Sequence, residues 1–96
     1  MKLTSTHVER TLSQYPARAI PDDHPMMPRF NTQFGNHTFF IDESGLIILE
    51  PAEAGDDGKM TGRVIKLAGW SDDRHTTLML HDREVTDILV VLDKAA

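Results

Sequence analysis

HTFFIDESGLIILE, residues 37–50, is the stretch of the sequence that decides its fold. Its first part, His37 to Ile41, consists mostly of the aromatic and β-branched residues that strands favour. Asp42 to Gly45 has the composition of a tight turn, in which glycine takes the positive φ that other residues avoid. Leu46 to Leu49 is apolar again, and Pro51 ends the pattern. The stretch therefore predicts a β-hairpin from about His37 to Glu50.

Further strands are expected after the hairpin. Met60 to Trp70 mixes apolar and basic residues and predicts a long strand. A turn at Ser71 to Arg74 separates it from a fourth predicted strand, Thr76 to Leu80. Between the second and third strands, Ala52 to Lys59 predicts a small acidic loop that turns at Asp57-Gly58.

The last segment, residues 82–94, has two interpretations. Val85, Ile88, Leu89 and Leu92 recur at the spacing of one helix face. However, the segment is rich in β-branched residues, which disfavour a helix, and apolar residues alternate with aspartates as in a strand. The strand is the favoured interpretation, and it places a hairpin turn at His81 to Glu84.

The chain begins with a predicted short helix, Thr6 to Tyr15. Thr6 and Glu9 have the spacing of a capping box, and Val8, Leu12 and Tyr15 form one apolar stripe. Pro16 ends the helix because the residue before a proline avoids the helical region.

Residues 16–28 form a proline-rich arm that holds four of the five prolines. Proline fixes φ and removes a backbone donor, so the arm is expected to be extended or turning. Phe30 and Phe34 follow in a segment with little expected regular structure. The favoured interpretation is a stiff connector that packs its methionines on the core; the alternative is a recognition segment for a partner. Whether residues 16–36 are ordered stays open.

Together these elements predict an α+β fold in one domain, residues 1–96. A mostly antiparallel sheet of three to five strands is expected in the β-hairpin core, residues 37–96. Residues 1–36, the short helix and the proline-rich arm, are expected to cover one face of that sheet, because small hairpin sheets normally bury one face.

Composition excludes several classes of partner. The formal net charge is −5, and the ten basic residues are spread along the whole chain. Nucleic acids and anionic membranes both attract concentrated basic surfaces, so neither is an expected partner. There is no cysteine, and no stretch approaches the roughly 20 apolar residues of a membrane span. A cytoplasmic protein is expected.

Residues with catalytic potential do not form a recognisable motif. No two of the five histidines have the i, i+4 spacing of a zinc-binding helix. The acid pairs fall in predicted turns, and no serine lies in a nucleophile elbow. The sequence therefore predicts no catalytic residue, metal site or cofactor, and an enzyme is not expected.

The leading functional hypothesis is a non-enzymatic interaction or accessory domain that binds another protein or itself. Phe39 and Phe40 should point to opposite faces of their strand, so one of them needs a cover. An uncovered apolar face or sheet edge favours association. A second hypothesis is a small-ligand site between sheet and arm, with His37, Asp42, Arg63 and His81 as polar groups; a metal-assisted hydrolase is a third. The candidate binding residues are Met26, Met27, Phe30, Phe34, His37, Phe40, Arg63 and His81.

Overall fold

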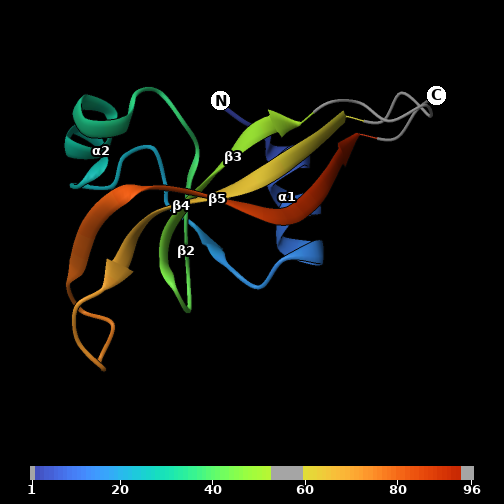
Figure 1. Ribbon diagram of the computed structural model, residues 1–96. Helices are drawn as coiled ribbons and strands as arrows, with labels where there is room; N and C mark the ends of the chain where they lie inside the picture. The colour runs from blue at the N-terminus through green and yellow to red at the C-terminus, as the bar shows by residue number, and fades with distance from the viewer. Residues whose placement is uncertain (1, 53–59, 94–96) are drawn as a thin grey trace.

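A five-stranded antiparallel sheet with strands in chain order, β1-β2-β3-β4-β5, forms the centre of the molecule (Figure 1). The computed structural model describes residues 2–52 and 60–93. Two short helices accompany the sheet in these ranges, which confirms a small α+β fold. The elements are α1 (Ser5–Gln14), β1 (Arg18–Ala19), α2 (Met27–Phe34), β2 (Phe39–Asp42), β3 (Gly45–Ala52), β4 (Met60–Trp70) and β5 (Leu78–Asp93).

The predicted hairpin is confirmed as β2 and β3. The side chain of Asp42 closes the turn, because its Oδ1 accepts from the backbone N–H groups of Ser44 at 2.8 Å and Gly45 at 2.9 Å. Gly45 has φ +131°, and a Cβ built on it would lie 2.0 Å from the carbonyl oxygen of Ala68 in β4. The turn therefore requires glycine both for its backbone conformation and for the close approach of β4.

Phe39 and Phe40 point to opposite faces, as predicted, and each face has its own helix. The α2 face buries Phe39 with Met27 and Phe30 of α2. The α1 face buries Phe40, against which Val8 of α1 packs. The expectation that helix and arm cover a single face was wrong, because the sheet is apolar on both sides and each side needs a cover.

Helix α1 begins two residues earlier than its capping box suggested. Thr4, not Thr6, is the N-cap, and its hydroxyl accepts from the N–H of His7 at 3.2 Å. After the helix, the Tyr15 hydroxyl donates to the Asp42 carboxylate, which ties the end of α1 to the β2–β3 turn.

Helix α2 and strand β1 were missed in the sequence. Pro28 lies in the first turn of α2, where the missing N–H costs nothing because first-turn N–H groups have no partner within the helix. Phe30 then packs on Phe39 with their ring centroids 5.1 Å apart, and this contact holds the short helix on the sheet. β1 lies inside the proline-rich arm and pairs with β2, Arg18 opposite Ile41.

Strand β5 confirms the strand interpretation over the described part of residues 82–94, but it contains no turn at His81 to Glu84. It runs unbroken for 16 residues beside the 11 residues of β4. Three irregularities take up the difference: residues 81–83 lie opposite the single residue Leu67, residues 86–88 lie opposite Val64, and Leu92 is an extra residue between the pairs Met60–Asp93 and Thr61–Val91. The predicted turn and Leu78 to Leu80 of the predicted fourth strand are thus parts of one long bulged strand, which begins two residues later than predicted.

Two further expectations concern the acidic loop and membrane-spanning segments. The acidic loop with its Asp57-Gly58 turn lies outside the described ranges, apart from Ala52. Within these ranges, neither helix has the length and apolar character needed to cross a bilayer.

Candidate functional site

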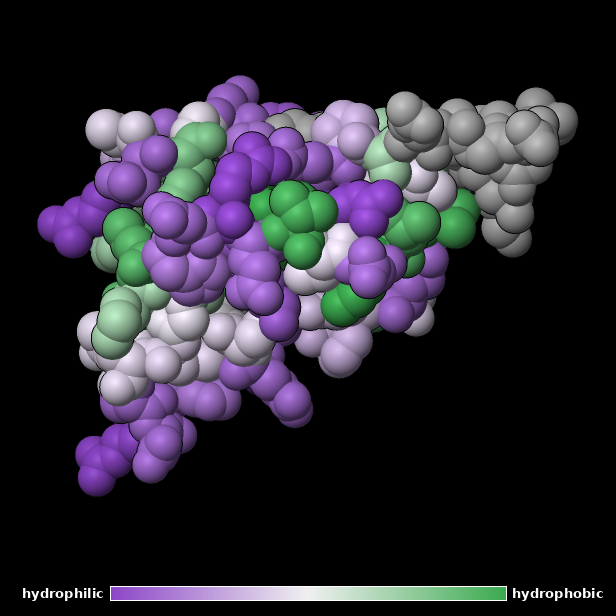
Figure 2. All heavy atoms as spheres, in the orientation of Figure 1, coloured by the Kyte–Doolittle hydropathy of each residue, from purple (hydrophilic) through white to green (hydrophobic). Residues whose placement is uncertain are grey.

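The outer edge of β5 carries most of the exposed apolar surface. β5 is the last strand of the sheet, so no strand lies beside its outer edge in the part of the chain described. Among the described residues, eight large apolar side chains are exposed, and five of them belong to this strand. Figure 2 shows apolar side chains interrupted by polar ones along the course that β5 takes in Figure 1. We call this surface the β5 strip: Met79, Leu80, Val85, Ile88 and Leu89, each 40–62% exposed.

Helix α1 closes one end of this edge. The amide of Gln14 pairs with the backbone of Val91 like a neighbouring strand: its Nε2 donates to the Val91 carbonyl at 2.7 Å, and its Oε1 accepts from the Val91 N–H at 2.9 Å. Arg10 donates to the carbonyl of Leu92 at 2.8 Å. Outward-pointing backbone groups alternate along a regular strand, so Leu89 also directs its N–H and carbonyl outward. The open edge therefore begins at Leu89 and runs back to Leu78.

The second bulge is held in place by side chains. The Thr86 hydroxyl donates to the Val64 carbonyl at 2.7 Å, where the ladder between β4 and β5 is interrupted. Arg63 donates to the Thr86 carbonyl at 2.9 Å, and the Ile88 N–H donates to the Thr86 hydroxyl at 3.2 Å. These bonds replace lost ladder bonds, so the bulge is a built feature of the edge.

Charged side chains are interspersed with the apolar ones. Asp82, Glu84 and Asp87 are exposed on β5. The strand's one basic residue, Arg83, forms an ion pair with Glu50 of β3. The exposed part of β5 is therefore both apolar and acidic.

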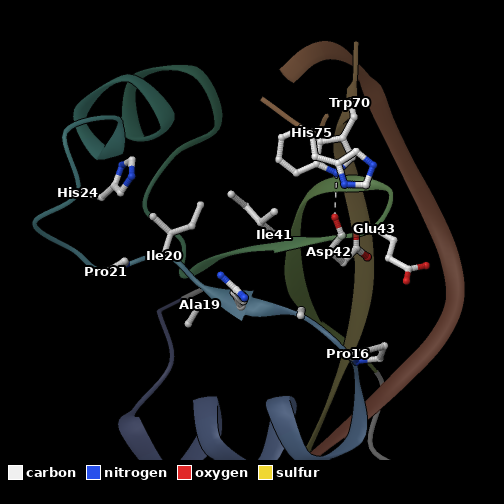
Figure 3. Close-up of a pocket in the computed structure, with 12 residues that line it drawn as sticks. Pro16, Ala19, Ile20, Pro21, His24, Ile41, Asp42, Glu43, Trp70 and His75 are labelled. Carbon is white, nitrogen blue, oxygen red and sulfur yellow. Dashed lines mark hydrogen bonds between the residues drawn. The ribbon is translucent and has the colours of Figure 1, made fainter. Parts of the chain in front are cut away.

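A groove on the α2 face is the second candidate site. It lies between the arm and the loop that joins β4 to β5, in two adjoining hollows of about 820 and 580 Å³. In Figure 3, Ile20 and Ile41 lie between His24 on one side and the stacked rings of Trp70 and His75 on the other. The two rings are nearly parallel, with centroids 5.0 Å apart.

The loop of residues 71–77 positions His75 in this groove. His75 has a positive φ of 56°, which is uncommon for a residue other than glycine. The Asp72 carboxylate accepts from the Thr76 hydroxyl and from its N–H, the latter at 2.9 Å. These bonds lower the pKa of Asp72 and fix the turn that carries His75.

The predicted polar groups of a ligand site do not meet in the groove. Of His37, Asp42, Arg63 and His81, only Asp42 lines it. The Asp42 carboxylate is already engaged by the β2–β3 turn and by Tyr15. Burial, together with the hydrogen bond to Asp42, raises the pKa of Tyr15.

The candidate binding residues are distributed over the whole molecule. Met27, Phe30 and Phe40 lie in the core and offer almost no surface. Met26 is exposed at the start of α2, and Phe34 packs partly buried at its end. The His37 ring packs edge-on to Phe39, and burial lowers the pKa of His37. Arg63 belongs to β4 and donates to the Thr86 carbonyl of β5, and His81 belongs to β5 itself.

The apolar residues of the β5 strip were missed as candidates. Their signals in the sequence are the predicted strand Thr76 to Leu80 and the apolar, β-branched run near residues 85–92. Such signals predict strands, but they do not say whether a neighbouring element covers them. Val90 and Leu92 are buried, whereas Val85 and Leu89 are not.

No group of three or more histidine, aspartate or glutamate side chains within residues 2–52 and 60–93 is close enough to hold a metal ion. This chain matches no known protein family, no curated protein and no solved structure.

Proposed function

We propose that the chain is a non-enzymatic interaction domain that binds a protein partner along the open edge of β5. The observation that carries the proposal is the β5 strip: five large apolar side chains exposed on the strand whose outer edge has no neighbouring strand in the described part of the chain. Exposed apolar side chains gathered on one strand favour association, and an open edge offers backbone hydrogen bonds as well.

Two kinds of contact are available at this surface. The outward N–H and carbonyl groups of β5 can pair with an added strand, and the strip can bury apolar side chains of that strand. Either another protein or a second copy of this chain can supply it.

A display library of random peptides, selected on the immobilised chain, tests the proposal. Selected peptides are expected to bind the wild-type chain and to lose binding to a Val85→Lys, Leu89→Lys variant. Both substituted side chains are at least half exposed, so the variant should keep its fold. Leu12→Lys on α1 is the matched control, because Leu12 is also exposed but belongs to α1 and not to β5.

Analytical ultracentrifugation of the same three proteins at several concentrations tests whether the chain binds a second copy of itself. If the wild-type chain binds itself through this edge, the double variant is expected to sediment as a monomer and the Leu12→Lys control is not. The proposal is wrong if the selected peptides bind all three proteins equally and none of the proteins self-associates.

The groove supports a second candidate function, binding of a small ligand. Its size is in the range of small-molecule sites, and its floor is apolar. A ligand in the groove is expected to quench or shift the fluorescence of Trp70, the one tryptophan of the chain. A metabolite screen that leaves this fluorescence unchanged would argue against the second candidate.

A further inference from the structure

The charge of β5 restricts the chemistry of its partner. Asp82, Glu84 and Asp87 are exposed among the apolar side chains, and the positive charge of Arg83 is paired with Glu50. A strand added beside β5 would lie within a few ångströms of these carboxylates. Opposite charges directly across a strand pair stabilise it and like charges destabilise it. The edge therefore favours a strand with basic residues.

A second copy of the chain is a poorer match by the same criterion. It would bring its own Asp82, Glu84 and Asp87 to the contact, and the whole chain already has a net charge of −5. Charge repulsion would act in addition to this local mismatch.

The bulges favour a flexible partner over a folded one. Residues 81–83 and 86–88 interrupt the regular ladder, and hydrogen bonds from Thr86 and Arg63 fix the second interruption. Two rigid bulged edges can pair only where their irregularities match, and natural sheets use bulges to discourage such pairing. An unstructured segment can adjust its own backbone to the bulged strand as it binds.

Helix α1 defines where such a segment ends. Gln14 already occupies the outward N–H and carbonyl of Val91. The first outward pair that remains open belongs to Leu89, which is also half exposed. A bound strand therefore extends from Leu89 towards Leu78 and stops at α1.

We propose that the partner at β5 is an extended segment of another protein in which basic and apolar residues alternate, and that it adds to the sheet as a sixth strand. This inference rests on the proposed function, because it names the occupant of the same edge. The apolar residues of the segment would pack on the β5 strip, and its lysine or arginine side chains would face Asp82, Glu84 and Asp87.

Three short synthetic peptides test the chemistry: valine alternating with lysine, with threonine or with glutamate. In fluorescence anisotropy with the full chain, the lysine peptide is expected to bind most tightly, the threonine peptide less tightly and the glutamate peptide least. Raising the salt concentration should weaken the binding of the lysine peptide more than that of the others, since salt screens exposed charges.

Variants of the chain separate charge from backbone pairing. Removing three exposed charges (Asp82→Asn, Glu84→Gln, Asp87→Asn) should lower the affinity for the lysine peptide about tenfold. A matched control removes three exposed acids elsewhere and should leave binding nearly unchanged: Glu9→Gln, Asp23→Asn and Glu43→Gln. Leu89→Pro removes an outward N–H, which an edge strand tolerates, and should abolish binding. Thermal unfolding reports whether this variant folds; if it does not, the charge variants still decide.

The outcomes distinguish this inference from the proposed function. Equal binding of the lysine and glutamate peptides overturns the basic partner, while the interaction at β5 stands. A chain that binds none of the peptides but dimerises, with Val85→Lys abolishing the dimer, identifies a second copy instead. If the chain shows neither peptide binding nor dimerisation, both this inference and the proposed function are wrong.

Discussion

The two edges of the sheet differ in almost every property that governs association. β1 has two residues, and Pro16 and Pro21, which cannot donate a backbone hydrogen bond, lie close on either side of it. β5 has 16 residues, no proline and five exposed large apolar side chains. Short strands and prolines are the usual protection of an edge, whereas β5 relies on bulges and charges. β1 is thus a protected edge, whereas β5 exposes apolar side chains along an edge that no strand of the described chain covers.

The largest expected effect is a difference in how much stability is lost when a side chain near each edge is truncated. Phe40 lies opposite Ala19 of β1 and is fully buried, whereas Leu89 of β5 is half exposed. Phe40→Ala should lower the free energy of unfolding by about 3–5 kcal/mol, because it leaves a cavity in the core. Leu89→Ala should cost less than about 1 kcal/mol. Urea denaturation of both variants measures this, and similar losses would remove the contrast.

The next effect concerns Tyr15, which ties the chain ahead of β1 to the β2–β3 turn. Its hydroxyl donates to the partly buried Asp42 carboxylate, so Tyr15→Phe should cost about 1.5 kcal/mol at neutral pH. Burial and Asp42 raise the pKa of Tyr15, so the folded state holds this proton more tightly than the unfolded state does.

The raised pKa of Tyr15 also makes its contribution to stability depend on pH. Its stabilising contribution is complete below the unfolded pKa of about 10 and is lost as the pH rises above that value. Urea denaturation at increasing alkaline pH should show a steeper loss for the wild-type chain than for Tyr15→Phe. Since Tyr15 is the only tyrosine, phenolate absorbance reports its titration directly. A normal titration near pH 10 would contradict the prediction.

A smaller effect tests how α1 closes the far end of β5. Gln14→Ala removes both hydrogen bonds to Val91 and should lower the free energy of unfolding by about 1 kcal/mol. It should also accelerate hydrogen exchange of the Val91 amide. Ser13→Ala is the control, because the Ser13 hydroxyl bonds within α1 to the Arg10 carbonyl. Equal exchange at Val91 in both variants would mean that Gln14 does not protect the edge.

The smallest effect is expected at the closed edge itself. Pro21→Ala restores one backbone donor beside β1 and increases the freedom of the unfolded chain, which should cost about 0.5 kcal/mol. Peptide binding at β5 should not change. If the variant gained peptide binding at β1, proline would be the main protection of that edge, and its short length would count for less.

The sequence predicted those elements whose local signals agree with each other. In residues 37–50 the turn chemistry of Asp42 and Gly45 and the strand preference of both arms favour the same hairpin. Residues 82–94 had two competing periodicities, and pairing with β4 decided for the strand. The helix at Met27–Phe34 was missed because Pro28 was interpreted as a breaker, although the first turn accepts it.

The candidate site was harder to predict because exposure depends on what lies next to a residue. Phe40 and Val85 are both apolar strand residues, yet α1 and its neighbours cover the first while the second is 61% exposed. Arg63 and His81 were selected for their chemistry, and the fold places them at β5 for reasons that the sequence does not contain. The bulges arise from the pairing of β4 with β5, so spacing within one strand could not reveal them.

Gly45 and Gly69 lie opposite each other in the ladder, yet they should respond differently in a library of all single substitutions. A side chain at Gly45 would collide with the Ala68 carbonyl, whereas a Cβ at Gly69 has its nearest neighbour, the Ser44 carbonyl oxygen, at an ordinary 3.7 Å. Only glycine should survive selection for folding at position 45, while alanine should be recovered at position 69. The fold thus leaves one of two facing glycines free to drift and fixes the other.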